Sequence, residues 1–179
     1  MKIRIADIMD NDVVDGVDVC VSLWTQGCPF HCFNCHNEQT WDFDKGTEVD
    51  VDELVSSIVN KININGIIRN FSVLGGEPLC KENIHQVAYI IHKVREYYPY
   101  IIIFVWTGNT YESLMNNYND DIKSIFNDID ILIDGQYVDS LRNITLFLRG
   151  STNQRVINIK EMRNTNSFDN IILVEGKTI

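Results

Sequence analysis

Apolar residues along the chain change between two periods, and this change predicts a series of strands and helices. Residues 17–25 and 71–74 are short apolar runs that predict buried strands, the second ending at a pair of glycines. Residues 101–106 and 129–133 are almost continuously apolar and rich in β-branched side chains, as in central parallel strands covered on both faces. Residues 145–148 and 170–175 predict two further short strands.

Helical spacing appears between these runs. Residues 51–62 repeat apolar side chains at helical spacing, and Asp50 with Glu53 three positions later resembles a capping box that starts the helix. A second helix is predicted over residues 84–98 and ends at Pro99, and a less regular one over residues 111–126. Strands that alternate with helices predict an α/β fold with a mainly parallel sheet, and no linker or repeat divides the chain.

Polar and glycine-rich loops follow each predicted strand. In α/β folds the loops at the carboxyl ends of parallel strands hold the active site. Four loops are therefore candidates: residues 27–37 after the first strand, 75–78 after the second, 107–110 after the third and 134–136 after the fourth.

Composition narrows the class of protein. Of the 179 residues 45% are hydrophobic and 22% charged, which is typical of a globular domain. The net charge of −10 argues against a nucleic-acid binder that neutralises phosphates. The sequence has no signal-peptide pattern and no apolar run of about 18 residues, so we expect a cytoplasmic protein that does not bind membranes.

Three of the five cysteines crowd into residues 27–37, which we call the cysteine loop. An odd number with this crowding does not suggest disulfides and favours a metal or catalytic role in a reducing compartment. We expect Cys20, in an apolar run, to be a buried small hydrophobe. Cys80 follows residues 75–79, which we call the glycine turn. A role for Cys80 at the site is the less favoured interpretation.

Cys28, Cys32 and Cys35 have C-x3-C-x2-C spacing. Thiolates are soft ligands that suit zinc or iron–sulfur clusters. A structural zinc site needs four ligands, which His31 or His36 would complete, but no second C-x2-C pair is present. Three thiolates on a four-iron cluster leave one iron open to a substrate.

This spacing, together with Gly75-Gly76-Glu77-Pro78, resembles the radical S-adenosylmethionine superfamily. Many members have an aromatic residue before the third cysteine, where this chain has Asn34, so Phe33 and His36 become candidates to face the adenine. The resemblance implies a small incomplete (β/α) barrel in one domain, residues 1–179, and a 4Fe-4S cluster on Cys28, Cys32 and Cys35. It also implies a set of residues that contact S-adenosylmethionine: Asn34, Cys35, His36, Gly75, Gly76, Glu77 and Thr107.

Further motifs are similar to the activating enzymes of anaerobic ribonucleoside-triphosphate reductase. They are residues 37–41, 106–108, 130–135 and 149–155, with the last two the most specific to this family. The resemblance implies that a flavodoxin or similar donor reduces the cluster and that S-adenosylmethionine yields a 5′-deoxyadenosyl radical. That radical takes a hydrogen atom from a glycine of the large reductase subunit, so no side chain acts as a general base. It also predicts a cavity open beside the cysteine loop.

Two other functions stay open at this stage. One is a different radical enzyme: an activase of another glycyl-radical protein, or a small-molecule enzyme of the queuosine-pathway type. The other is a zinc or iron–sulfur module in electron transfer or assembly. The 149–155 loop itself has three interpretations: a solvated loop, a carboxylate site or a partner surface.

Overall fold

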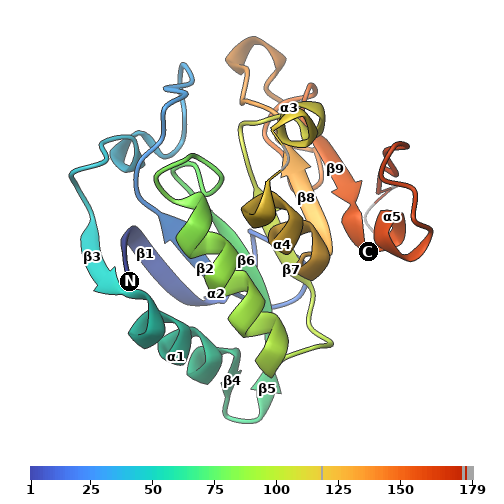
Figure 1. Cartoon of the computed structure of the whole chain (residues 1–179). Helices are drawn as coiled ribbons and strands as arrows, with labels where there is room; N and C mark the ends of the chain where they lie inside the picture. The colour runs from blue at the N-terminus through green and yellow to red at the C-terminus, as the bar shows by residue number, and fades with distance from the viewer. Residues whose placement is uncertain (118, 175, 177–179) are drawn as a thin grey trace.

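The computed structural model describes residues 1–117, 119–174 and 176 of the chain. Strands and helices alternate along it (Figure 1). The elements in chain order are β1 (Lys2–Asp12), β2 (Cys20–Thr25), η1 (Glu38–Thr40), β3 (Thr47–Asp50), α1 (Val51–Ile62), β4 (Asn63–Ile64), β5 (Ile67–Ile68), β6 (Asn70–Gly75), α2 (Ile84–Tyr97), β7 (Ile103–Trp106), α3 (Tyr111–Asn116), α4 (Asp120–Asp128), β8 (Ile131–Asp134), η2 (Asp139–Leu141), β9 (Arg155–Asn158) and α5 (Ile159–Asn164).

Seven strands form one sheet in the order β3-β1-β2-β6-β7-β8-β9. Its centre is parallel, because β2 pairs with β6, β6 with β7 and β7 with β8 in that sense. The strands β1 and β3 at one edge and β9 at the other are antiparallel. The predicted α/β fold with a mainly parallel central sheet is therefore confirmed. The strand order is that of an open sheet, so the incomplete barrel is not confirmed.

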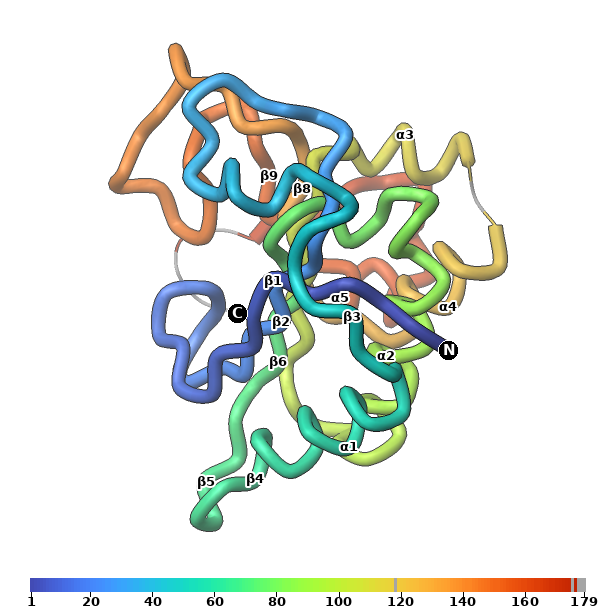
Figure 2. Tube along the Cα trace, turned by 90° about the vertical axis from the view of Figure 1, so that its left-hand side faces the viewer, coloured from blue at the N-terminus to red at the C-terminus, as the bar shows by residue number. Residues whose placement is uncertain are grey.

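Helices α1, α2 and α4 pack on one face of the sheet, to the right of it in Figure 2. Alternate side chains of the central strands, such as Val21, Leu23 and Val73, bury against them in one large core. Each fully buried aliphatic side chain of this kind stabilises the fold by about 1.5–3 kcal/mol. Helix α1 begins where the sequence predicts, since the Asp50 carboxylate accepts the N–H groups of Asp52 (2.9 Å) and Glu53 (3.3 Å).

The other face of the sheet is covered by loops. A smaller apolar cluster of Cys20, Phe104, Ile131, Ile133 and Val156 lies there. The loop of residues 13–19 runs over this face, on the side away from the helices in Figure 2. Cys20 is fully buried in the cluster, as expected. Because loops rather than helices cover this face, it has room for a cavity.

Several predicted elements differ from the structure. The strand predicted over residues 17–25 begins only at Cys20, and the helix predicted over residues 111–126 is two helices, α3 and α4. The strand predicted over residues 145–148 is wrong, because the Asn143 side chain accepts the N–H (2.9 Å) and hydroxyl (2.8 Å) of Thr145 and turns the chain. Residues 170–175 give one bridge, from Leu173 to Ile157, and residue 175 lies outside the described residues.

Strands β1, β3 and β9 were not predicted. Residues 2–12 carry too many polar side chains for a buried-strand pattern, because this edge of the sheet is partly exposed. Within the described residues, none of the helices is both long and apolar enough to cross a membrane.

Candidate functional site

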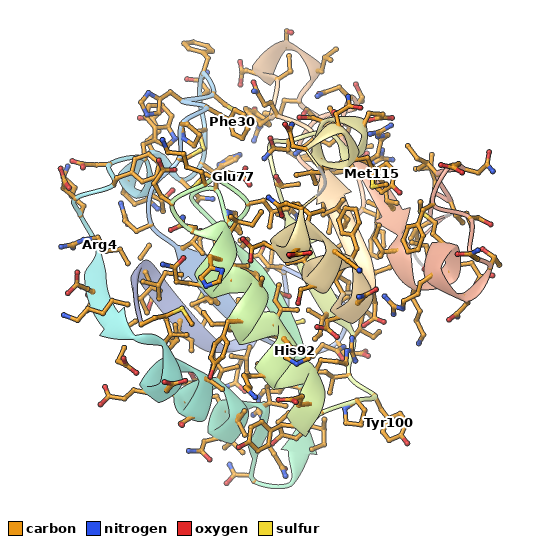
Figure 3. All side chains as sticks on the ribbon, in the orientation of Figure 1. Arg4, Phe30, Glu77, His92, Tyr100 and Met115 are labelled. Atoms are coloured by element: carbon orange, nitrogen blue, oxygen red, sulfur yellow. The ribbon has the colours of Figure 1, made fainter. Side chains whose placement is uncertain are left out.

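The four candidate loops meet at one end of the sheet, beyond the carboxyl ends of its parallel strands. Strands β2, β6, β7 and β8 are parallel neighbours, so their carboxyl ends lie together. Phe30 of the cysteine loop and Glu77 of the loop after β6 lie at this end (Figure 3). The topology therefore brings together the motifs that the sequence singled out.

The cysteine loop is held by its own backbone and by Gln26. The Gln26 amide nitrogen Nε2 donates to the carbonyls of Gln39 (3.2 Å) and Asp42 (2.8 Å), while the Gly27 N–H donates to the Thr40 carbonyl (2.8 Å). Gly27 has φ +94°, and a Cβ there would lie 2.2 Å from the Phe43 ring, so only glycine fits. The loop thus begins from a fixed point at the end of β2.

All three loop thiols line a common cavity of about 570 Å³, which we call the cysteine cavity. Cys28 is buried, and burial raises the pKa of its thiol to about 11, against the effect of the Phe30 and His31 N–H groups. Burial and the neighbouring Cys35 raise the pKa of Cys32. Cys32 and Cys35 are partly exposed, so the cavity is open to solvent beside the cysteine loop, as predicted.

Backbone N–H groups act on the loop thiols. The Asn37 N–H donates to the Cys35 sulfur (3.4 Å). The N–H groups of Phe30 and His31 lower the pKa of Cys28, and that of Tyr137, from the loop after β8, lowers the pKa of Cys32, in both cases against the larger effect of burial. N–H groups beside a sulfur stabilise its thiolate and tune the potential of iron–sulfur clusters. The donor set fits a cluster bound by three thiolates.

Gly75 and Gly76 line the cavity, but backbone packing already explains them. A Cβ on Gly75, which has φ +106°, would lie 2.7 Å from the Thr25 nitrogen. A Cβ on Gly76 would lie 2.4 Å from the Gly27 carbonyl oxygen. The two glycines therefore let the loop after β6 pack directly on the start of the cysteine loop.

Glu77 lines the cavity as a buried brace between two loops. Its carboxylate accepts the Thr107 hydroxyl (2.7 Å), the Gly108 N–H (2.7 Å) and the Leu79 N–H (2.9 Å). Burial raises the pKa of Glu77, and these hydrogen bonds oppose the shift. Thr107 is buried as well, and its hydroxyl oxygen also accepts the Asn109 N–H (3.0 Å). This network ties the end of β6 to the end of β7.

The side chains expected near the adenine lie apart from one another. His36 is exposed, lines the cavity and contacts the Tyr137 ring, with centroids 6.1 Å apart. Asn34 is exposed with φ +54° and does not line the cavity, and Phe33 is 75% exposed. His31, the other possible zinc ligand, stacks on Trp41 at 4.7 Å. Among the described residues, no three His, Cys, Asp or Glu side chains are grouped to hold a single metal ion.

Asp134, at the end of β8, is a structural residue. Its carboxylate accepts the Tyr111 N–H (2.7 Å) and pairs with the Arg155 guanidinium, whose Nε lies 2.9 Å from Oδ1. Arg155 also pairs with Glu112 at 2.8 Å through both oxygens, and this pair lowers the pKa of Glu112 to about 2. None of these three charged side chains lines the cysteine cavity.

Sequence reasoning missed several residues that line the cavity. Trp24 and Trp106 come from the ends of β2 and β7, and Tyr137 and Gln154 from later loops. The tryptophans lie at alternate positions to the helix-facing residues, and this alternation was the available signal. Asp15 also lines the cavity; burial, with the charge of Asp12, raises its pKa to about 7.

Comparisons with known proteins give the chain relatives over most of its length. Residues 14–157 match the family model described as a 4Fe-4S single cluster domain. A relative from Escherichia coli (strain K12) is 30% identical over 150 residues, 83% of this chain and 94% of the relative. One from Enterobacteria phage T4 is 33% identical over 150 residues (81% and 87%), and one from Vibrio cholerae serotype O1 is 30% identical over 144 (80% and 90%). All three are named anaerobic ribonucleoside-triphosphate reductase-activating protein.

Proposed function

The chain belongs to the family of anaerobic ribonucleoside-triphosphate reductase-activating proteins, and from this premise we propose that it is a radical S-adenosylmethionine activase of the anaerobic reductase. The observation that carries the proposal is the cysteine cavity. Its wall holds three thiols at the spacing of such enzymes, in a chain that matches a 4Fe-4S domain over residues 14–157.

In this proposal the active site lies at the carboxyl ends of the parallel strands. Cys28, Cys32 and Cys35 hold a 4Fe-4S cluster, which together with bound S-adenosylmethionine supplies the electron transfer and the 5′-deoxyadenosyl radical that abstracts hydrogen from a glycine. The chain's own residues bind and orient the cluster and S-adenosylmethionine, and they exclude water. A cavity of about 570 Å³ is of the size expected for a small-molecule cofactor site.

The cofactor-binding roles of the predicted residues are part of the proposal. Gly75 and Gly76 expose backbone at the cavity wall, where a ligand's amino group can approach. Glu77 and Thr107 act by keeping the loops after β6 and β7 in place, since their polar atoms are bonded to one another. Cys35 and His36 line the cavity beside the cofactor, whereas Asn34 would need to reach it from the loop's outer side.

The partners follow from the same proposal. The glycine-bearing loop of the large reductase subunit enters the open side of the cavity beside Cys32 and Cys35. A flavodoxin or similar one-electron donor reduces the cluster, in the cytoplasm and away from membranes. The incomplete barrel and the single domain over residues 1–179 stay predictions that rest on the resemblance to this family.

The experiment that tests the proposal is anaerobic reconstitution with iron and sulfide, followed by dithionite and S-adenosylmethionine. We expect a brown protein that forms 5′-deoxyadenosine and then a glycyl radical signal on co-expressed reductase. Cys32→Ala should abolish 5′-deoxyadenosine formation. Cys80→Ala is the matched control, because Cys80 is a buried cysteine outside the cysteine loop and should leave cleavage intact.

A reconstituted protein that holds no cluster, or holds one and forms no 5′-deoxyadenosine, would sink the proposal. A colourless, air-stable protein that binds zinc would favour the metal-module interpretation instead. Cleavage without a glycyl radical on this reductase would keep the radical chemistry and point to another glycyl-radical partner.

A further inference from the structure

Polar side chains of the 149–155 loop hydrogen-bond to the segment that follows β8. The Gln154 amide nitrogen Nε2 donates to the Gly135 carbonyl (3.0 Å), and the Asn153 amide nitrogen Nδ2 donates to the Gln136 carbonyl (2.8 Å). We call residues 135–137 the wall segment, because all three line the cysteine cavity. Two amide side chains of one loop thus hold two successive carbonyls of another.

The same loop is fixed from within. Gln154 Oε1 accepts the N–H groups of Gly150 (2.9 Å) and Ser151 (3.1 Å), and Arg149 donates to the Gln154 carbonyl (2.7 Å). Gly150 lies against the Tyr137 ring, where a Cβ would come within 3.2 Å of the ring carbon Cδ2. The amide ends of Gln154 therefore serve two separate purposes: the oxygen shapes the 149–155 loop, and the nitrogen attaches the wall segment.

The wall segment faces the cysteine loop. The ring of Tyr137 contacts the ring of His36, and its hydroxyl donates to Asp139 (2.9 Å). Tyr137 lines the same cavity as Cys32 and Cys35. The wall segment therefore lies across the cavity from the cluster thiols and contacts the cysteine loop at His36.

We propose that Gln154 and Asn153 are positioning residues, which clamp the wall segment against the cysteine loop so that Tyr137 stays packed on His36 and the wall of the cluster site stays closed. This inference rests on the proposed function, since it requires a cluster on the three thiols. It gives the 149–155 loop a role that differs from a solvated loop, a carboxylate site or a partner surface.

Residues that hold the surroundings of a metal's ligands control both metal retention and redox potential. Removing such a partner lowers metal affinity about 10- to 100-fold. The exposure of a cluster to solvent also sets its potential, so a wall segment released from the cysteine loop shifts the reduction potential. Releasing the clamp should therefore change the cluster even when no reductase is present.

Gln154→Glu separates the two purposes of this side chain. A carboxylate keeps an acceptor for the N–H groups of Gly150 and Ser151 but has no donor for the Gly135 carbonyl. Asn153→Asp removes the second donor in the same way. The matched control is Gln86→Glu on α2, which also removes one amide donor from a backbone carbonyl, that of Lys2 (3.2 Å); neither residue lines the cavity.

The readouts are iron release to a chelator, the cluster's reduction potential and the spectrum of the reduced cluster, all in the reconstituted protein without reductase. We expect the double variant Gln154→Glu/Asn153→Asp to release iron at least about tenfold faster and to have a shifted reduction potential. The Gln86→Glu protein should match the wild type. Equal melting temperatures of the variants before reconstitution would show that the fold is retained.

Unchanged iron release and potential in the double variant would overturn the inference. If glycyl-radical formation alone then fell, the loop would be a partner surface. A double variant that does not fold is replaced by the Asn153→Asp single change, at an exposed residue, with the same readouts. A wild-type protein that assembles no cluster would instead overturn the proposed function, so the two failures are distinct.

Discussion

The carboxyl group of Asp15 links the stability of the fold to pH. Burial, and then the negative charge of Asp12, raises its pKa from 3.8 to about 7. A carboxyl whose pKa is higher in the folded than in the unfolded state favours folding when protonated. Its contribution to stability is therefore complete below pH 3.8 and is lost as the pH rises to about 7.

Asp15→Asn removes this group's titration while keeping its size. We expect the variant to gain stability relative to the wild type as the pH rises from about 4 to about 8, because only the wild type then carries a buried second charge beside Asp12. Thermal unfolding of both proteins across this range measures the difference. Asp44→Asn, at an exposed aspartate, is the control and should show no such trend. A pH-independent difference for Asp15→Asn would contradict the interpretation.

Among the elements, Arg155 joins three that are distant in sequence. It begins β9, pairs with Asp134 at the end of β8 and with Glu112 in α3. The Asp134 side chain is 1% exposed and that of Arg155 28%, so this is a largely buried ion pair with a partly exposed end. Breaking a buried pair strands the remaining charge, which costs more than the pair itself contributes.

Arg155→Met should lower the free energy of unfolding by about 2–3 kcal/mol, below the usual range for a buried pair because the arginine is partly exposed. Urea unfolding measures this change. Adding Asp134→Asn should restore part of the loss, since the double variant leaves no buried unpaired carboxylate, and Glu112 is 56% exposed. A double variant less stable than the sum of the single changes would show that charge is not the cause.

At the scale of the whole molecule, apolar side chains are exposed in two loops at the cysteine-loop end of the sheet. Phe33 of the cysteine loop is 75% exposed, and Ile144 in the loop before β9 is 81% exposed. The cysteine loop and the loop before β9 rise at the same end of the sheet in Figures 1 and 2. Exposed apolar residues beside a cavity that must admit a partner's loop favour this end as the docking face of the reductase.

Ile144→Asp should lower glycyl-radical formation on the reductase about tenfold, as expected when a charge replaces an apolar contact at an interface. Cleavage of S-adenosylmethionine without reductase should stay unchanged, because Ile144 does not line the cysteine cavity. The radical signal and 5′-deoxyadenosine measure the two activities. The control is Tyr100→Asp, at a residue 96% exposed that precedes β7 and so lies at the other end of the sheet (Figure 3). Equal losses in both variants would argue against this docking face.

The sequence by itself determined the features that depend on neighbouring residues. Helix α1 starts at Asp50 because a carboxylate caps nearby N–H groups. The apolar runs at residues 71–74, 101–106 and 129–133 contribute central strands because they are short and β-branched, which favours a buried strand over a helix. Because these strands are parallel, their loops lie at one end of the sheet. The sequence therefore correctly predicted that the cysteines and the glycine turn lie together. These are local patterns, and burial of apolar surface acts on them wherever they lie in the chain.

Tertiary structure alone decided which residues support one another across the chain. Strands β1 and β9, which flank the parallel centre, have weak local patterns and are stabilised by hydrogen bonds to their neighbours in the sheet. Glu77 was expected to contact the cofactor, yet its carboxylate is bonded to Thr107, 30 positions away. Gln154 bonds to Gly135 at a separation of 19. Such pairings depend on where the backbone carries each group, and a buried polar atom takes the partner that the fold brings within reach.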